Sequence, residues 1–365
     1  MYKQDNPIKN SHLVAAKLID WYLRNHRDLP WRQSRDPYRI WLSEIILQQT
    51  RVQQGLPYYQ RFIEAYPSVQ ALAAAPEQEV LRLWQGLGYY RRARNLHACA
   101  RQVVEQHSGI FPQSYEVLQK LPGIGKYTAA AIASFAFQKA VPVVDGNVYR
   151  VLARLYGETT DIASPGAFKV FFNIGEQLID RQQPDTFNQA IMEFGALHCT
   201  PLKPLCLYCP LQQQCWAFAH SQQHVLPVKS KKAAVRFRYF HYLVIVSADG
   251  KMLMRARPAG DIWQGLYDFY LLESALTLHE EPEALEEDPL LQELLRLQPM
   301  YEASPAYSHQ LTHQRLHVRF FLFKLAEKQL RKLVFPPEFV WFSPSEAEQI
   351  PKPVLIQNYL KDVRF

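Results

Sequence analysis

Apolar residues recur at every third or fourth position through much of residues 11–225, which is the period of one face of an α-helix. Leu13, Ala16 and Ile19 begin the clearest of these repeats. Breaks such as Tyr66-Pro67 and Leu121-Pro122-Gly123 separate the segments, as expected where helices end. No segment in this half alternates as a strand does, so the pattern predicts a mainly α-helical unit built from many short helices.

The pattern changes after residue 225. Residues 226–238 are polar and basic and predict a linker. Beyond them, strand-like runs occupy residues 239–247, 251–257, 267–272 and 316–324, whereas residues 275–297 and 344–362 have a helical pattern. We therefore expect three parts, which are a helical region (1–225), a linker (226–238) and an α/β domain (239–365).

Length and charge narrow the class of protein. A chain of 365 residues is too long for one compact domain of ordinary size. Its longest nearly apolar stretch, residues 128–137, is about half of the roughly 20 residues that a membrane span needs. The first residues lack the apolar core of a signal peptide, so we expect a cytoplasmic protein without membrane contact. The net charge of +7 lies mostly in residues 1–225, which suits a polyanionic partner such as nucleic acid.

Four of the five cysteines lie within 17 residues, at Cys199, Cys206, Cys209 and Cys215. Such a tight group indicates a metal centre rather than disulfides. Four thiolates can surround either a tetrahedral zinc ion or an iron–sulfur cluster. Zinc sites more often pair two close doublets, so the spacing favours the cluster, and zinc remains the alternative. Four cysteine ligands leave no open coordination position, which predicts a structural role.

A glycine-rich turn separates two apolar helical segments at Leu121-Pro122-Gly123-Ile124-Gly125-Lys126. Gly123 and Gly125 permit a tight turn whose backbone N–H groups point outward at the start of a helix. That arrangement, together with Lys126, suits a DNA phosphate and predicts a helix-hairpin-helix.

Two acidic residues occupy unusual places. Glu44 is embedded in an apolar helical segment, where it is either part of a capping box or a buried functional group. Asp145 follows Val143-Val144 and precedes Gly146-Asn147, a position that a plain helix N-cap would explain by itself. Residues 48–51, which include Gln49 and Thr50, form a polar surface after the segment of Glu44.

Aromatic residues flanked by cations occur in two further segments. Residues 86–95 mix glycine, tyrosine and arginine, and Trp31 lies between Arg27 and Arg32. Such compositions suit phosphate contact and base stacking.

Taken in their order along the chain, these motifs resemble those of the helix-hairpin-helix DNA glycosylases, and most closely those of the adenine DNA glycosylases of the MutY family. The resemblance continues through residues 262–269 and 307–313, which are similar to that family's C-terminal, Nudix-like lesion-reading domain. It implies an enzyme that flips adenine out of an A:8-oxoguanine or A:G mispair in double-stranded DNA and hydrolyses its N-glycosidic bond. It also implies a monomer with a [4Fe–4S] cluster on the four cysteines.

The resemblance assigns roles to individual residues. Glu44 would protonate adenine at N7, and Asp145 would stabilise or transiently trap the sugar cation. Tyr127 and Asn147 would orient Asp145 and the substrate. The adenine pocket would be lined by Arg27, Trp31 and Gln189, and the stack left by the flipped base would be filled by Gln49 and Tyr89. The 8-oxoguanine would be read by Tyr307, Ser308 and His309, and Thr50 would be a further substrate contact. Tyr307 departs from the phenylalanine common at its place.

Three rival functions have weaker support. A glycosylase/lyase of the endonuclease III type needs a lysine two residues after Gly125, where this chain has Tyr127, and Lys126 would point about 100° away on a helix. Nucleotide hydrolysis by the second domain needs an Arg-Glu-x2-Glu-Glu helix, which the acidic run at residues 280–288 does not supply. A non-catalytic DNA-binding protein would not need both Glu44 and Asp145.

Overall fold

The computed structural model describes residues 11–230, 235–285, 287–298 and 300–363. By their contacts, residues 1–74 and 95–231 form one compact unit, and residues 75–94 and 232–365 form a second. The predicted linker falls partly on residues 231–234, which lie outside the described residues. Each unit is described below by itself.

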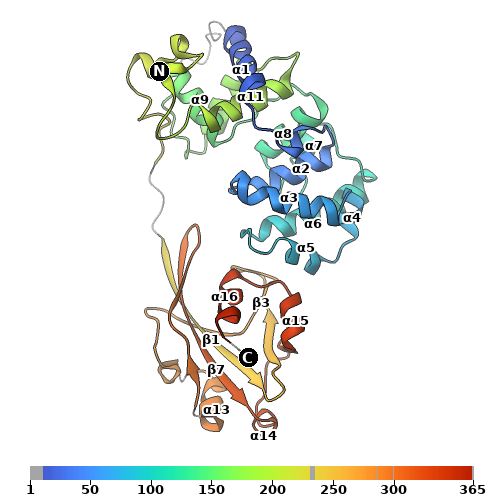
Figure 1. Cartoon of the computed structure of the whole chain (residues 1–365), viewed down its shortest axis with the longest axis vertical. Helices are drawn as coiled ribbons and strands as arrows, with labels where there is room; N and C mark the ends of the chain where they lie inside the picture. Colours follow the sequence, from blue (N-terminus) through green and yellow to red (C-terminus); the bar gives the residue numbers. More distant parts are fainter. Residues whose placement is uncertain (1–10, 231–234, 286, 299, 364–365) are drawn as a thin grey trace. The chain divides into compact units, whose positions relative to one another are not determined.

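Within residues 11–74 and 95–230, the first unit contains helices joined by loops and no strand, as the sequence pattern predicted (Figure 1). Its elements are α1 (Ser11–Asn25), η1 (Pro30–Arg32), α2 (Pro37–Leu47), α3 (Val52–Ala65), α4 (Val69–Ala74), α6 (Arg91–His107, shared with the second unit), α7 (Tyr115–Leu118), α8 (Lys126–Phe137), α9 (Gly146–Tyr156), α10 (Ala167–Leu178), α11 (Pro184–Leu197), η2 (Cys206–Tyr208), η3 (Gln212–Gln214) and α12 (Trp216–Ala219).

Helix α11 is central to this unit, because it packs against α1, α8 and α9. Its apolar face buries Phe187 and Phe194 in one core with Leu18 of α1 and Leu152 of α9. Each such side chain contributes about 1.5–3 kcal/mol when it is fully removed from water. This core fixes the helices whose ends carry the site.

Local signals set where the site-bearing helices begin. Asp36 caps α2, with its Oδ1 accepting a hydrogen bond from the backbone N–H of Tyr38 at 2.9 Å, and Pro37 takes the first helical position. Asp145 caps α9 in the same way. Gly157 ends α9 in the left-handed conformation at φ 66°.

The second unit contains a mixed sheet of β1 (Arg236–Ser247), β2 (Met252–Ala256), β3 (Tyr267–Asp268), β4 (Tyr270–Ser274), β5 (Glu302–Ala303), β6 (Tyr307–Gln310), β7 (Gln314–Leu325) and β8 (Val340–Phe342). Its helices are α5 (Glu77–Leu83), η4 (Pro282–Leu285), α13 (Pro289–Leu297), α14 (Glu327–Leu330), α15 (Pro344–Gln349) and α16 (Val354–Asp362). The main path of the sheet runs β3-β2-β1-β7-β5, with β4 on β1, β6 on β7 and β8 on β2. The long central pair β1–β7 is parallel, and the other strand pairs are antiparallel.

Both faces of the sheet are covered. Tyr242 and Phe320 pack on one face with Tyr359 of α16. Leu243 packs on the other face with Leu291 of α13. Because successive residues of a strand point to opposite faces, β1 buries a nearly continuous apolar run rather than an alternating one.

The two long helical segments predicted for this unit are shorter in the structure. Within residues 275–297, regular α-helix begins only at Pro289, where Asp288 caps α13 and its Oδ1 accepts from the N–H of Leu291 at 3.0 Å. Residues 344–362 divide into α15 and α16, because Pro351 and Pro353 force their preceding residues into extended backbone. In the described part of the chain, no helix is both long and apolar enough to cross a membrane.

Candidate active site

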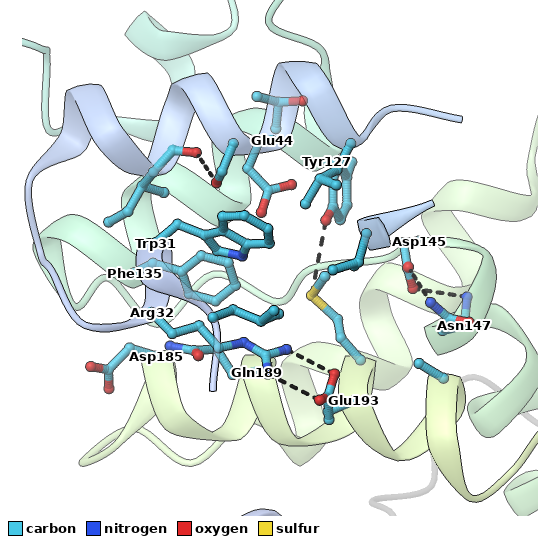
Figure 2. Close-up of a pocket in the computed structure, with 18 of the residues that line it drawn as sticks. Trp31, Arg32, Glu44, Tyr127, Phe135, Asp145, Asn147, Asp185, Gln189 and Glu193 are labelled. Atoms are coloured by element: carbon cyan, nitrogen blue, oxygen red, sulfur yellow. Dashed lines mark hydrogen bonds and ion pairs between the residues drawn. The ribbon is translucent and has the colours of Figure 1, made fainter. Parts of the chain in front are cut away.

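A cavity of about 970 Å³ opens among the helices of the first unit. Its lining includes these residues that the sequence singled out: Arg27, Trp31, Glu44, Gln49, Thr50, Gly125, Lys126, Tyr127, Asp145, Asn147 and Gln189. They come from segments more than 100 residues apart, and Figure 2 shows many of them around one space. The structure therefore brings the two candidate acids, Glu44 and Asp145, to the same cavity.

Glu44 lies in α2 and is 9% exposed. Burial raises the pKa of its carboxyl to about 7, against which a hydrogen bond from Tyr127 acts in the opposite direction. Its carboxyl is directed toward Tyr127 at the cavity (Figure 2). Of the two explanations offered by the sequence, the buried group holds, because a carboxyl with this pKa keeps its proton over much of the neutral range.

Asp145 is both a helix cap and a cavity residue. Its Oδ1 accepts from the backbone N–H of Asn147 at 2.9 Å and of Val148 at 2.8 Å, and its Oδ2 accepts from Nδ2 of Asn147 at 2.9 Å. Burial raises its pKa, and these hydrogen bonds oppose that shift. The N-cap geometry thus holds the carboxylate in one orientation at the cavity.

Asn147 is itself held by Arg150. Its Oδ1 accepts from Nη2 of Arg150 at 2.9 Å, and the same guanidinium donates to the carbonyls of Gly195 and Cys199 at 2.7 Å each. The buried guanidinium of Arg150 therefore holds Asn147, and through it Asp145, in place.

Tyr127 is the second residue of α8, and its side chain points into the cavity (Figure 2). Burial, followed by the nearby charges of Glu44 and Asp145, raises its pKa well above 10. Its hydroxyl lies 4.0 Å from Sδ of Met192. Tyr127 therefore remains a neutral phenol beside Glu44.

The sequence analysis missed the most highly connected group of the cavity, which is Glu193 with Arg27 and Arg32. Glu193 is 1% exposed and accepts hydrogen bonds from both guanidinium groups. Burial alone would raise its pKa, but the bonds to Arg27 and Arg32 outweigh that effect and lower it strongly. A signal existed, since Glu193 lies four residues after Gln189 on the same helical face, within an apolar run.

Next to Glu193 and its two arginines, the cavity is lined by aromatic side chains and by the amide of Gln189. Oε1 of Gln189 accepts from the hydroxyl of Tyr22 at 2.7 Å, and Tyr22 was another residue that the sequence did not single out. Trp31 is 8% exposed and packs edge-on against Tyr59, with ring centroids 5.2 Å apart. This combination of flat apolar surface and a few hydrogen-bonding groups is typical of a small-molecule pocket.

The predicted hairpin forms the turn before α8. Gly123 has φ 75°, and a Cβ added there would lie 2.8 Å from Cβ of Asn95. Gly125 caps α8 with φ −87° and has open space around it. Nζ of Lys126 lies 4.7 Å from the centroid of the Phe168 ring. Glycine is thus required at position 123 by conformation and by space.

Two of the other predicted substrate contacts lie at strained turns. Gln49 and Tyr89 both have positive φ, at 55° and 50°. Gln49 is exposed, and Thr50 is half-buried with its hydroxyl 3.4 Å from the carbonyl of Gln48. Tyr89 belongs to the second unit, where its hydroxyl bonds to that of Thr312.

The predicted triplet Tyr307, Ser308 and His309 forms strand β6, so its side chains alternate between the two faces of the sheet. Tyr307 donates to Oδ2 of Asp362 at 2.8 Å, and the ring of His309 lies 5.7 Å from that of Trp263. Ser308 is exposed on the opposite face. The three residues are therefore adjacent in the chain but do not converge on one point.

The four cysteines surround the end of α11 and the turns η2 and η3, and all are free thiols. Burial raises the pKa values of Cys206, Cys209 and Cys215, and the charge of Cys199 raises each further. Nη1 of Arg154 donates to Sγ of Cys199 at 3.4 Å. Over the residues that the structure describes, no group of three or more His, Cys, Asp or Glu side chains is arranged to hold a metal ion, and this applies equally to zinc and to an iron–sulfur cluster.

Comparison with known proteins matches two separate ranges of the chain to two families. Residues 42–170 match the HhH-GPD superfamily of base excision DNA repair proteins, and residues 241–362 match the NUDIX domain. The first unit is similar to a solved thermostable thymine-DNA glycosylase, with a TM-score of 0.54 and 30% identity over 58% of this chain and 98% of that one. The fold is therefore that of a helix-hairpin-helix base excision repair protein with a Nudix-like second domain.

Two curated relatives define the family more closely. The adenine DNA glycosylase of Buchnera aphidicola subsp. Acyrthosiphon pisum is 34% identical over 259 residues, which cover 71% of this chain and 74% of that protein. The adenine DNA glycosylase of Mus musculus is 46% identical over 217 residues, or 57% of this chain and 42% of that protein. The chain belongs to the adenine DNA glycosylase family, as its motifs predicted. The matched part of this chain spans less than half of the length of the mouse relative.

Proposed function

We propose that this protein is a DNA repair glycosylase that excises adenine mispaired with 8-oxoguanine or guanine. The observation that carries the proposal is the presence of Glu44 and Asp145 at one cavity, with a raised pKa on Glu44 and three hydrogen bonds favouring the carboxylate of Asp145. A cavity of about 970 Å³ has room for a base flipped out of the duplex.

The two acids suit the two charges that develop when an N-glycosidic bond breaks. The base gains negative charge, and protonated Glu44 gives its proton to N7 of adenine. The sugar gains positive charge, and the carboxylate of Asp145 stabilises that cation. Water then adds to C1′, and the proton that it loses returns the ionised Glu44 to its acid form, so the products are adenine and an abasic sugar. The same division between an acid and a carboxylate serves O-glycoside hydrolysis.

The proposed reaction is monofunctional, because the chain offers no amine at the position where a lyase carries one. Tyr127 occupies that position, and the ammonium of Lys126 is held over Phe168 instead. Without a Schiff base to the sugar, the DNA backbone stays intact after the base has left.

Double-stranded DNA is the proposed partner, bound by a monomer. The backbone turn at Gly123 and Gly125 and the exposed Lys126 at the start of α8 suit a phosphate, which the helix dipole also favours. In the second unit, the exposed hydroxyl of Ser308 is the best placed of the three predicted residues to read 8-oxoguanine. Oxidation turns N7 of guanine from an acceptor into a donor, and a hydroxyl can accept from it.

The four cysteines are proposed to hold a [4Fe–4S] cluster. Their thiols are free and interact electrostatically with one another, and Arg154 donates to Cys199 and to the carbonyls of Thr200 and Pro201, which suits an anionic cluster. When bound, the cluster would supply structural cross-linking, since four thiolate ligands leave no iron position open to substrate.

Nucleotide hydrolysis by the second unit has little support. Helix α13 carries one acidic residue, Glu293, which forms a salt bridge with Arg296 at the surface. A single paired carboxylate does not provide the set of oxygen ligands that magnesium needs.

The deciding experiment uses duplexes with A:8-oxoguanine, A:G or A:T pairs. We expect strand cleavage only after alkali treatment, and only with the two mispairs, because excision leaves an abasic site in an intact strand. Cleavage before alkali treatment would indicate a lyase, and no cleavage in any duplex would contradict the proposed function.

A further inference from the structure

Glu193 binds two of the arginines that line the cavity, Arg27 and Arg32, with one carboxylate. Its Oε1 accepts from the backbone N–H of Arg27 at 3.0 Å, from Nε of Arg27 at 2.8 Å and from Nη1 of Arg32 at 3.0 Å. Its Oε2 accepts from Nη2 of Arg27 at 2.6 Å and from Nη2 of Arg32 at 2.8 Å. Five donors occupy the roughly four lone-pair sites of the group, so each guanidinium is held in a fixed plane.

This arrangement fixes a whole segment of the chain. Arg27 and Arg32 stand at the two ends of the connection that carries Trp31, and Nη1 of Arg32 also donates to the carbonyl of Arg27 at 3.0 Å. Glu193 lies on α11, 166 residues from Arg27 in the sequence. The connection is therefore tied at both ends to the central helix of the unit, and Trp31 is held at the cavity between them.

The same carboxylate changes the charge of the wall. Arg27 and Arg32 line the cavity with side chains 39% and 16% exposed, and Glu193 offsets one of their two charges. The other ionisable groups that line the cavity are His26, Arg35, Glu44, Lys126, Tyr22, Tyr127, Tyr149, Asp145 and Asp185. Of these, Asp185 is paired with Arg35 at 3.1 Å.

Two guanidinium groups side by side bind a phosphate as readily as a carboxylate, because both ligands match the same fork of N–H donors. A DNA strand offers a phosphate at every nucleotide. A cavity with Arg27 and Arg32 unpaired would therefore attract the backbone, whereas a flipped base is neutral.

We propose that Glu193 is a specificity-determining positioning residue, which makes this cavity a pocket for an uncharged base by clamping Arg27 and Arg32 and occupying the site that a phosphate would otherwise take. The assignment of the base as adenine rests on the proposed function, but the exclusion of phosphate does not. Glu193 acts through the two arginines and Trp31 rather than by touching the reacting bond.

The test compares the full-length wild-type protein with Glu193→Gln. The control is Glu105→Gln, which removes a glutamate that also pairs with an arginine, at 3.5 Å from Arg101, but is exposed on α6. Thermal unfolding is followed with inorganic phosphate replacing chloride at constant ionic strength. We expect phosphate to raise the melting temperature of Glu193→Gln by more than it raises that of wild type or of the control, which share the turn at Gly123 and Gly125, because an additional ligand that binds the folded state stabilises it further. A response to phosphate equal to that of wild type would overturn the proposal.

A double variant separates charge from damage to the fold. Arg32→Gln combined with Glu193→Gln restores the net charge of the wall, so we expect its response to phosphate to return to that of wild type. An additional response that persists in the double variant would show that the extra phosphate binds elsewhere and would contradict the proposal.

Single-turnover excision from an A:8-oxoguanine duplex tests positioning. Glu193→Asp keeps the charge but shortens the reach, and we expect its rate to fall about 10- to 100-fold without any sensitivity to phosphate. A wild-type rate in this variant would refute the positioning role. Failure of the wild-type protein to excise adenine would refute the proposed function, while the thermal experiment would still test the clamp.

Discussion

Replacing Glu44 with glutamine should remove the catalytic acid and, above neutral pH, stabilise the protein. In the folded chain the pKa of Glu44 is raised from 4.5 to about 7, mainly by burial. The folded state therefore binds the proton more tightly than the unfolded state does. Stability that is fully present below about pH 4.5 is lost as the pH rises through about 7.

The magnitude follows from the shift of about 2.5 pKa units at about 1.4 kcal/mol per unit. Relative to low pH, the difference in the pKa of Glu44 between the folded and unfolded states lowers the folding stability by about 1.4 kcal/mol at about pH 5.5 and by about 3.3 kcal/mol at about pH 8. Because glutamine does not titrate, the stability of Glu44→Gln relative to wild type should rise by about 2 kcal/mol between these two pH values.

The assay is urea unfolding of wild type, Glu44→Gln and the exposed control Glu105→Gln at both pH values. Single-turnover excision by wild type should fall about tenfold per pH unit above about pH 7, and Glu44→Gln should lose about 10²- to 10⁴-fold in rate. If the stability of Glu44→Gln relative to wild type were equal at both pH values, the pKa of Glu44 would not be raised in the folded state. A wild-type rate independent of pH to about pH 9 would remove Glu44 as the acid.

Four further predictions test other parts of the molecule. Asp145→Asn should abolish excision but leave DNA binding within a fewfold of wild type, since it adds no repulsion with phosphate; near-normal single-turnover rates would show that the carboxylate is dispensable. Ser308→Ala should lower the preference for A:8-oxoguanine over A:G by about ten- to a hundredfold, the effect of losing one hydrogen bond of about 1–3 kcal/mol, while excision from A:G duplexes continues; an unchanged ratio at fixed salt would refute lesion reading by this residue. The purified protein should be brown and contain about four iron and four sulfide per chain, and a colourless, stoichiometric zinc protein would contradict the cluster. Gly123→Ala should cost about 1–2 kcal/mol and weaken DNA binding because φ is positive there, whereas the control Gly125→Ala has negative φ and free space and should be tolerated.

Local sequence was sufficient for the features that depend on neighbouring residues. Helical periodicity identified the first unit, and the glycines of the hairpin marked the turn before α8. The position of Asp145 before Gly146-Asn147 predicted a helix N-cap, and the structure contains it. Such features form through backbone conformation and hydrogen bonds within a few residues, so their signals lie in the local sequence. The helices expected over residues 275–297 and 344–362 are shorter in the structure, because Pro289 begins α13 and Pro351 and Pro353 separate α15 from α16.

The tertiary structure alone decided what these local features do together. Glu193 holds Arg27 across 166 residues of sequence, and no local pattern in either segment indicates that pairing. Ser308 faces away from Tyr307 and His309 because strand pairing with β7 sets the pleat, although the three are consecutive. The sequence of α2 shows that Glu44 is surrounded by apolar neighbours, but its pKa depends on how much water the packed helices exclude from it. Desolvation and long-range ion pairing depend on which surfaces meet in space, and that is determined only when the whole unit has folded.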